Sequence, residues 1–545
     1  MWTKSNSKFL IILVVLINLL ASHHANQAAG AQRDQPSASS SAPGAAATTP
    51  SARAGEYAAG LATPSDLSDR TAHNLFSINI TWVLIAGFLV MVIHAGFAMV
   101  ETGLCRSKNA AHTMSMNLMI YALGCLGFWA YGFAIGWGNW SNGPVAPGWH
   151  STLGPGTSVL NSGIGLGRAV DASGNPTGAF TYGLLGTKGF FLSGIDDAGV
   201  MALFFLMMVF MDTAATIPTG AMAERWTWKN FCCYGLWVAL PCCVYANWVW
   251  GGGWLAQAGV NWKLGHGAVD FAGSGVVHAM GGAIALAGAI VLGPRIGKYR
   301  GGKPQPIPGH HISMVAVGTF ILAFGWFGFT AGSTLAGTDL RISVAVVNTV
   351  LASIAGALAA MLTLQLKGMK PDPSIMCNGM LAGLVAIAAP CAFVDSWAAF
   401  FIGVVAGALA VFSVFFWERC KIDDPVGAVS VHGVGGLWGL VALGLFANGK
   451  YGAGWNGVVR DDFVRNYGSD GVRGLLFGDP AQFVMQIISA LVVAAFGFAM
   501  AYAWFKLSNR IAPIRVSGET EMQGLDGPEM GVLGYPDFSI SNNAS

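Results

Sequence analysis

Long apolar runs separated by short polar connections dominate the chain between residues 78 and 505. A helix that crosses a bilayer needs about 20 mostly apolar residues, and the chain has eleven runs of about that length. The pattern therefore predicts an all-α polytopic membrane protein with eleven transmembrane helices, at residues 78–101, 112–137, 197–221, 230–253, 271–294, 312–335, 342–366, 374–394, 396–417, 426–447 and 481–505.

The chain before the first run has a different composition. Lys4 and Lys8 precede an apolar stretch over residues 9–21, which is too short to span a bilayer and is typical of a signal peptide. An uncleaved first span is the alternative. The predicted organisation is a signal peptide (1–31), a disordered extracytoplasmic linker rich in Ala, Ser, Pro and Gln (32–72), a transmembrane domain (73–508) and a C-terminal tail (509–545).

Composition supports a membrane protein. Hydrophobic residues make up 54% of the 545 positions and charged residues only 10%, whereas a soluble protein has about 25% charged residues. The 75 glycines suit helices that pack at close range in lipid. A net charge of +2 without a basic run argues against nucleic acid as a partner, and the nine cysteines show no CxxC spacing.

The charges of the connections predict the orientation. An odd number of spans places the two ends of the domain on opposite sides, and a cleaved signal peptide leaves the mature N-terminus outside. The connections then predicted to be inside, with the tail, carry fifteen Lys and Arg residues against eight in the outer ones. This bias follows the positive-inside rule, so we expect a multi-pass protein of the cell (inner) membrane with a cytoplasmic C-terminus.

One polar motif occurs twice. The stretch Asp270–Gly282 recurs as Asp424–Gly436, with aspartate, glycine, valine, histidine and a glycine pair at identical spacing. The copies open the fifth and the tenth span. Because five spans is an odd number, spans 1–5 and 6–10 are predicted to be inverted repeats, with span eleven as an extra helix. The histidines, His278 and His432, lie 154 positions apart.

Each motif begins with a carboxylate at a helix start, where Asp270 and Asp424 can cap free N–H groups. Each histidine lies eight residues further on, about 12 Å deeper at 1.5 Å per residue, so both should meet near the middle of the bilayer. A polar group there normally faces the protein interior or a cavity. The alternatives are buried histidines bonded to backbone carbonyls, or a metal site, for which no further ligand cluster is apparent.

Aromatic residues flanked by glycine form a second feature. Trp250 precedes three glycines, and the segment 324–333 alternates phenylalanine and tryptophan with glycine. A tryptophan at a membrane interface is usually a belt residue, but an open indole face also attracts a small cation by about 0.5 to 2 kcal/mol. Both interpretations remain open from the residues alone.

Taken together, these segments resemble the ammonium transporter family (Amt/Mep/Rh), on its Amt side. The resemblance runs from about residue 75 to residue 536. It is carried by Trp250-Gly-Gly-Gly, the two histidine motifs, Gly325-Trp-Phe-Gly-Phe329-Thr-Ala-Gly-Ser333, Thr213-Ala-Ala-Thr-Ile-Pro-Thr-Gly-Ala-Met-Ala-Glu224-Arg225 and the segment that begins Asn378-Gly-Met-Leu-Ala-Gly.

The resemblance implies roles for residues on the outer side. Trp250, Ser333 and Phe210 would form a site that recruits ammonium, through cation–π contact and a hydroxyl acceptor. Phe210 and Phe329 would be stacked rings that block the pore beneath it. The family is typically trimeric, and the chain is therefore expected to form a homotrimer in the lipid bilayer. In this family the cytoplasmic tail commonly binds a P-II type signal protein, and the segment Gly524–Pro536 of this chain resembles that tail.

Deeper residues are assigned by the same resemblance. His278 and His432 would line the pore, and Asp270 would stabilise the cation or hold the outer site in shape. The sequence departs from the family at Thr330, where asparagine is frequent, and at Asp212, where many members are uncharged; we assign Asp212 no role.

The resemblance implies an ammonium transporter rather than an enzyme, with no cofactor and with deprotonation before conduction. Alternatives are an ammonium sensor of the same fold, which needs a signalling partner, and an Rh-like neutral ammonia channel. An intramembrane metalloenzyme is disfavoured because ligands are lacking.

Overall fold

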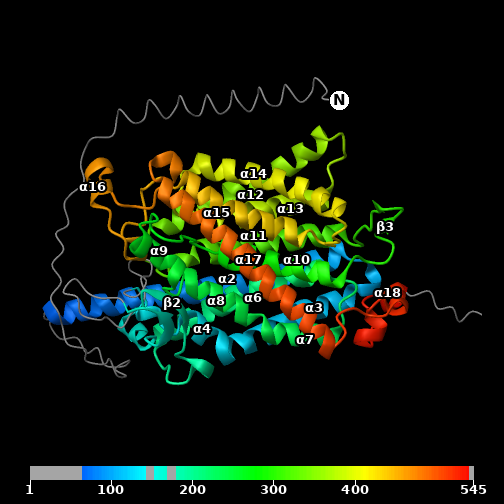
Figure 1. Ribbon diagram of the computed structural model, residues 1–545, viewed down its shortest axis with the longest axis horizontal. Helices are drawn as coiled ribbons and strands as arrows, with labels where there is room; N and C mark the ends of the chain where they lie inside the picture. The colour runs from blue at the N-terminus through cyan, green and yellow to red at the C-terminus, as the bar shows by residue number, and fades with distance from the viewer. Residues whose placement is uncertain (1–63, 143–151, 169–179, 539–545) are drawn as a thin grey trace, which may run out of the picture. The chain divides into compact units, whose positions relative to one another are not determined.

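The computed structural model describes residues 64–142, 152–168 and 180–538 (Figure 1). Its helices are α2 (Pro64–Leu104), α3 (Ala110–Gly127), α4 (Phe133–Trp137), α6 (Ala198–Met222), α7 (Trp228–Trp237), α8 (Ala239–Val249), α9 (Trp254–Trp262), α10 (Met280–Leu292), α11 (Ile312–Thr330), α12 (Arg341–Leu366), α13 (Pro373–Ile387), α14 (Ser396–Arg419), α15 (Gly435–Phe446), α16 (Asp461–Tyr467), α17 (Pro480–Ile511) and α18 (Gly518–Gln523). Short hairpins are made by β1 (Gly163–Leu166) with β2 (Tyr182–Gly186), and by β3 (Tyr299–Arg300) with β4 (Lys303–Pro304).

Ten helical segments within the described residues are long and apolar enough to cross a membrane, which confirms ten of the eleven predicted spans. The eighth predicted span, 374–394, is shorter than expected because α13 has 15 residues and ends at Ile387. Turns follow, and the carbonyls of Ala388 and Ala389 accept hydrogen bonds from the backbone N–H groups of Ala272 and Phe271 at 3.0 and 3.2 Å. The end of α13 is therefore tied to the loop before the first histidine motif.

Aspartates fix where several helices begin. Asp197, Asp372 and Asp479 each accept a hydrogen bond from a backbone N–H group in the first turn of the following helix. Pro373 and Pro480 follow two of them, at the first helical position, where a missing N–H costs nothing. These starts follow from local sequence chemistry alone.

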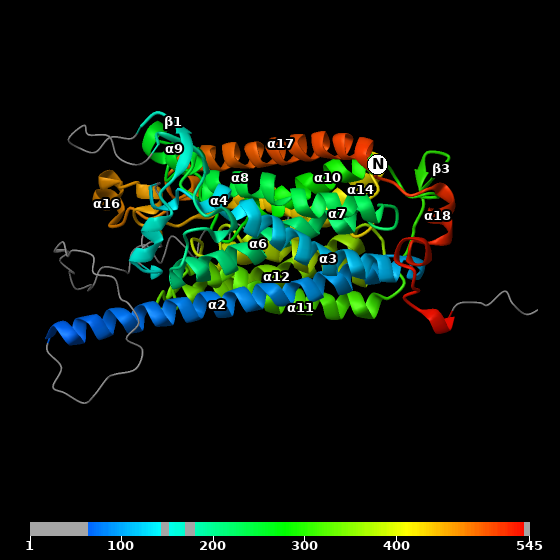
Figure 2. The ribbon, with the colours of Figure 1, turned by 90° about the horizontal axis from the view of Figure 1, so that it is seen from below.

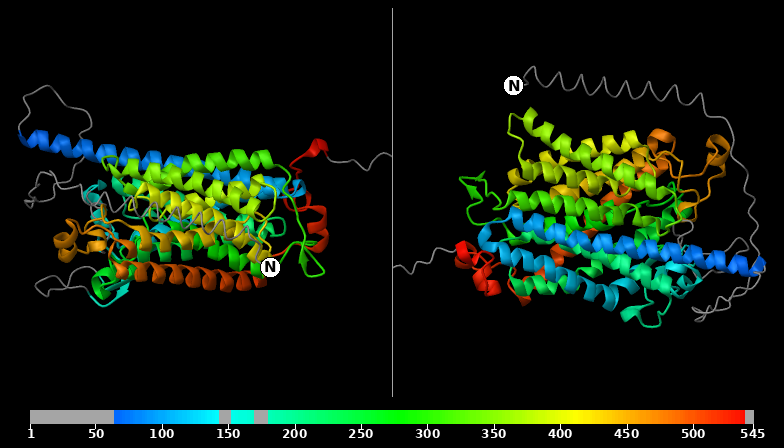
Figure 3. Two further views of the ribbon diagram at one scale, coloured as in Figure 1. Left: turned by 90° about the horizontal axis from the view of Figure 1, so that it is seen from above. Right: turned by 180° about the vertical axis from the view of Figure 1, so that it is seen from behind.

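The long helices run side by side, with connections gathered at two ends (Figure 2). We call the end that carries β1, β2, α9 and α16 the loop end, and the end that carries β3, β4 and α18 the tail end. Figure 3 shows α2 and α17 on opposite sides of the bundle. The long connection over 138–196 contains the β1–β2 hairpin among its described residues.

Only part of the predicted N-terminal organisation falls within the described residues. The proposed signal peptide (1–31) and most of the linker (32–72) lie outside the described residues. Residues 64–72 of that linker belong to α2, so disorder is wrong there: α2 continues beyond its apolar part, and the side chains of 68–72 are exposed. At the other end, α17 extends to Ile511, six residues beyond the predicted eleventh span.

Candidate functional site

Asp270 organises the loop that leads into the first histidine motif. Its buried carboxylate accepts three backbone hydrogen bonds, from Gly273 at 2.9 Å, Gly275 at 2.8 Å and Val276 at 2.9 Å. Gly273 has φ 100°, a left-handed conformation that glycine adopts without strain. The predicted capping role of Asp270 is confirmed, because three N–H groups at a buried helix start would otherwise lack acceptors.

Asp424 repeats this arrangement at the tail end. Its carboxylate accepts hydrogen bonds from the backbone of Gly427 at 3.0 Å and of Val429 at 2.7 Å. Gly427 has φ 80°. The two motifs therefore share sequence spacing, capping pattern and backbone conformation, as expected for inverted repeats.

Each histidine lies in a π-helical turn, namely η6 (Ser274–Ala279) and η8 (Val429–Val434). Such turns widen a helix locally and are frequent at functional sites. The Nδ1 atoms of His278 and His432 are 3.2 Å apart, and the ring centroids are separated by 5.3 Å. Both residues are buried. The prediction that the two imidazoles meet inside the bundle is confirmed.

Two glycines permit this meeting. A Cβ at Gly282 would lie 2.2 Å from the backbone N of Gly433, and one at Gly436 would lie 2.4 Å from the backbone O of Ser274. Both contacts are to backbone atoms, which cannot move aside as a flexible side chain can. The glycine pairs of the motif thus bring the two histidine-bearing turns together.

Aromatic rings continue from His278 toward the loop end. Trp326 stacks on His278 with ring centroids 4.9 Å apart and planes at 11°. The Phe329 ring lies 5.8 Å from His278 and 4.3 Å from Phe210, and Phe210 lies 6.0 Å from Trp250. The two predicted gate residues, Phe210 and Phe329, are therefore in contact with each other and lie between Trp250 and the histidines. Both are buried.

The polar groups of Trp250 and Ser333, beside these rings, already donate hydrogen bonds within the protein. The Trp250 Nε1 donates to the backbone oxygen of Asp270 at 2.6 Å, which couples the indole to the capped loop. The Ser333 hydroxyl donates to the backbone oxygen of Phe329 at 2.7 Å. Because a hydroxyl that donates one hydrogen bond still has acceptor lone pairs, Ser333 retains the capacity to accept from a small donor.

On the other side of the histidines, space opens toward the tail end. A cavity of about 20 Å³ is lined by His432, Phe97, Glu101, Asn378 and other side chains, and a cavity of that size holds about one water-sized molecule. A larger vestibule of about 840 Å³ follows and shares Asn378 and Val426 with the small cavity. A series of lining residues thus connects the histidines with the tail end.

Sequence reasoning missed three residues of this site. Trp326 stands three positions before Phe329 in a quoted motif, so helical spacing could have placed it on the same face. Phe97, whose ring centroid is 5.7 Å from that of His432, and Glu101 belong to α2, far from the motifs in sequence. Only the packing of α2 against the second half of the chain brings them to the cavity.

The two departures from the family pattern, Asp212 and Thr330, line neither of these two cavities. Asp212 is fully buried, and its Oδ2 is 3.0 Å from Nε2 of His94 in α2. Thr330 donates its hydroxyl to the backbone oxygen of Trp326 at 3.2 Å. The buried carboxylate of Asp212 is therefore paired with a histidine of α2.

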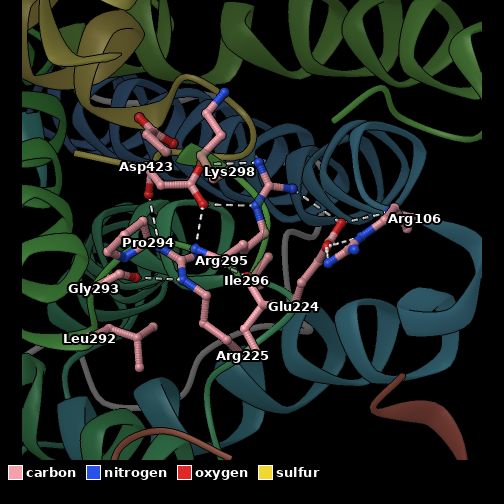
Figure 4. A network of polar contacts seen from close by, with 12 residues as sticks. Arg106, Glu224, Arg225, Leu292, Gly293, Pro294, Arg295, Ile296, Lys298 and Asp423 are labelled. Carbon is pink, nitrogen blue, oxygen red and sulfur yellow. Dashed lines mark hydrogen bonds and ion pairs between the residues drawn. The ribbon is translucent and has the colours of Figure 1, made fainter. Parts of the chain in front are cut away.

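A network of buried charges joins the connections at the tail end (Figure 4). Glu224 is ion-paired with Arg106 and, at 3.3 Å, with Arg295, and Arg295 bonds Asp423 at 2.8 Å. Burial alone would raise the pKa of Asp423, but the neighbouring Arg225 and Arg295 outweigh it and hold that pKa well below its usual value. The network ties the segment that follows α6 to the connections that follow α2, α10 and α14.

The tail folds back onto this end. The carboxylate of Asp526 accepts hydrogen bonds from the backbone of Ala111 at 3.1 Å and of His112 at 2.9 Å, in the first turn of α3. Lys108 donates to the backbone oxygen of Glu521 at 2.8 Å. Within residues 64–142, 152–168 and 180–538, no group of three or more His, Cys, Asp or Glu side chains is arranged to hold a metal ion.

Comparisons with known proteins agree with this geometry. Residues 81–535 match a family model described as the Ammonium Transporter Family. Ammonium transporter Amt2 of Archaeoglobus fulgidus is 43% identical over 468 residues, covering 85% of this chain and 89% of that protein. Ammonium transporter Amt1 of Haloferax mediterranei is 31% identical, covering 85% of this chain and 80% of its own length.

Solved structures give the same relationship. One described as a Sensor Amt Protein superposes with a TM-score of 0.68 at 29% identity, covering 84% of this chain and 99% of that one. Mep2 of Candida albicans superposes with a TM-score of 0.65 at 26% identity, covering 82% of this chain and 88% of the other.

Proposed function

The chain belongs to the ammonium transporter family and is an Amt-type ammonium transporter, and we propose a route for its substrate. Ammonium is recruited beside Trp250 and Ser333 and gives up a proton near Asp270 or the first histidine, His278. The ammonia and the proton then cross by linked routes past His278 and His432 and leave through the vestibule at the tail end, so that each cycle moves one positive charge.

The physical reason for deprotonation is the free-energy cost of removing water from a charged ion. Moving an intact cation through an apolar pore costs several kcal/mol or more, whereas neutral ammonia is cheap to desolvate. The observation that carries the proposal is the buried histidine pair, whose Nδ1 atoms are 3.2 Å apart between the gate and the cavity. A neutral imidazole donates at one nitrogen and accepts at the other, so the pair can exchange hydrogen bonds with ammonia.

The same argument gives selectivity. Potassium is similar to ammonium in size but has no hydrogen-bond donors and no proton to release. It would have to cross the gate of Phe210 and Phe329 as a charge, in contact only with rings that replace little of its hydration. We therefore expect potassium to be excluded.

The test is a double substitution, His278→Ala with His432→Ala, in proteoliposomes. Ammonium-evoked current on a solid-supported membrane should fall, or selectivity over potassium should be lost. The matched control is His266→Ala, because His266 is also a buried histidine but belongs to the loop end, where its Nε2 bonds the backbone oxygen of Asp470. Unchanged current and selectivity in the double variant would refute the role of the histidines.

We further propose that the loop end is outside and the tail end cytoplasmic. The Lys and Arg residues of the tail-end connections, including Arg106, Arg225 and Arg295, support this orientation through the positive-inside rule. Protease or antibody access to a C-terminal tag in sealed inside-out vesicles, but not in right-side-out vesicles, is the expected result.

A homotrimer and a P-II type partner at the tail are proposals that rest on family resemblance. The ordered contacts of Asp526 and Lys108 would hold the tail at the membrane surface, where a soluble partner can reach it. Native mass spectrometry should give a trimer, and a tail truncated after residue 511 should lose binding of P-II protein.

The sensor alternative is kept because one similar structure is described as a Sensor Amt Protein. A receptor would bind ammonium without sustained flux. Current that persists with the ammonium gradient and scales with protein density would exclude a purely sensory role.

A further inference from the structure

Glu101 is a buried carboxylate on the pore side of α2. Its side chain is 2% exposed. Asn117 Nδ2 and Thr219 Oγ1 both donate to Oε2 at 2.8 Å. A carboxylate inside a membrane bundle is costly and is usually functional, and neither of these partners carries a charge that would neutralise it.

The position of Glu101 relative to the pore distinguishes it from a purely structural group. It lines the small cavity together with His432, Phe97 and Asn378. Ammonia that has passed His432 must enter this space before it reaches the vestibule. The cavity offers a carboxyl group, the ring of Phe97 and room for about one small molecule.

We propose that this cavity is an inner recapture site, in which Glu101 returns a proton to ammonia and then holds the ammonium ion until it leaves. The inference deepens the proposed function and rests on the passage of neutral ammonia past the histidines. Glu101 touches the reacting molecule here and therefore acts as the general acid of the exit step.

The step balances as a single proton transfer. The O–H bond of the protonated carboxyl breaks, a fourth N–H bond forms on ammonia, and a carboxylate faces an ammonium ion. The carboxylate and the Phe97 ring both favour a cation. Ammonium then moves past Asn378 and Val426 into the vestibule, and the proton that crossed with ammonia past the histidines reprotonates Glu101, so that each cycle moves one positive charge.

Other ionisable groups face this carboxyl and belong to the same electrostatic environment. Asp424 lines the vestibule and adds negative charge, while His432 lines the cavity together with Glu101. Cys105 on the connection after α2 and Tyr234 on α7 are also electrostatically coupled to Glu101. The dependence of transport on internal pH must therefore be measured against variants that leave these groups in place.

The experiment compares Glu101→Gln with wild type in proteoliposomes whose internal pH is varied between about 6 and 8, with external conditions fixed. Gln keeps the size and an acceptor oxygen for Asn117 and Thr219 but has no proton to give. We expect the ammonium-evoked current to fall at least about tenfold, as for removal of a general acid, and to lose its dependence on internal pH.

Thr219→Val is the structural control, because it removes one hydrogen bond to Glu101 and leaves the acid; it should keep the internal-pH dependence. Glu101→Asp retains an acid on a side chain shorter by one methylene and should shift the pH midpoint. If Glu101→Gln does not give a monodisperse protein, the pH midpoint of Glu101→Asp is the measurement that tests the proposal. Wild-type current and pH dependence in Glu101→Gln, or a wild-type midpoint in Glu101→Asp, would overturn the proposal.

The outcomes separate this inference from the proposed function. Loss of current in the histidine double variant together with unaffected Glu101 variants would refute only the recapture site. Absence of ammonium-dependent current in wild type would refute the proposed conduction itself.

Discussion

Replacing Asp270 by asparagine separates its charge from its capping role, because the chain contains a matched control. Asp270 and Asp424 occupy equivalent positions in the two repeats and cap equivalent turns. Asn keeps one acceptor oxygen, but its NH2 group replaces the other oxygen and cannot accept a hydrogen bond from a backbone N–H group. In Asp270→Asn the oxygen can serve Gly275 and Val276, while the hydrogen bond to Gly273 is lost.

The stability effects should be similar. Each substitution removes one charge-assisted hydrogen bond, worth about 1.5–3 kcal/mol. The effects on recruitment should differ, since only Asp270 is linked to Trp250, through the indole N–H at 2.6 Å. Two opposite unit charges about 8 Å apart attract by about 2 kcal/mol at an effective dielectric constant near 20, which is roughly thirtyfold in binding, and we take this value for a cation over the Trp250 ring.

The assay pairs thermal unfolding in detergent with ammonium-evoked current over a range of ammonium concentrations. Both variants should melt at similarly reduced temperatures. Asp270→Asn should require roughly thirtyfold more ammonium for half-maximal current, and Asp424→Asn should remain close to wild type. Equal losses of apparent affinity in the two variants would refute an electrostatic role for Asp270 and leave only its capping function.

Three further outcomes follow from the packing. Asp212→Ala leaves the buried His94 without its partner and should destabilise the protein by about 1–3 kcal/mol; His94→Gln with Asp212→Ala should recover part of that loss in a double-mutant cycle of unfolding, and additive losses would contradict the pairing. Gly282→Ala places a methyl group 2.2 Å from the Gly433 nitrogen, so it should cost about 1–3 kcal/mol and reduce current, whereas Gly527→Ala, where no atom lies within 4 Å and φ is not positive, serves as the control for added bulk at a glycine. Burial, opposed by the hydrogen bond to Asp470, lowers the pKa of His266 to about 4; since the unfolded chain takes up this proton first, stability should fall as pH drops from about 6.5 to about 4, by roughly 3 kcal/mol in total. His266→Asn should flatten the melting temperature over that range, and an unchanged slope would show that another group titrates.

Much of the helix pattern could be predicted from the sequence. A spanning segment is helical because its backbone polar groups must be satisfied within the segment, and it needs a long apolar run because its side chains cross the hydrocarbon core; such runs are visible directly in the sequence. The recurrence of Asp270–Gly282 as Asp424–Gly436 likewise predicted two capped turns and a pair of meeting histidines. The exception was α13, which ends early because the loop of the other repeat supplies donors to Ala388 and Ala389, a contact between segments more than a hundred residues apart.

The sequence by itself determined the membrane class, ten of the spans and the residues that carry the motif, since these depend on local hydrophobicity, spacing and capping. Only the tertiary structure decided which side chains share a cavity. Phe97 and Glu101 on α2 face His432 because helices pack across the bundle, and Asp212 finds His94 on a helix more than a hundred residues earlier. Such pairings depend on the rotation and register of whole helices, and short-range patterns along a chain do not specify them.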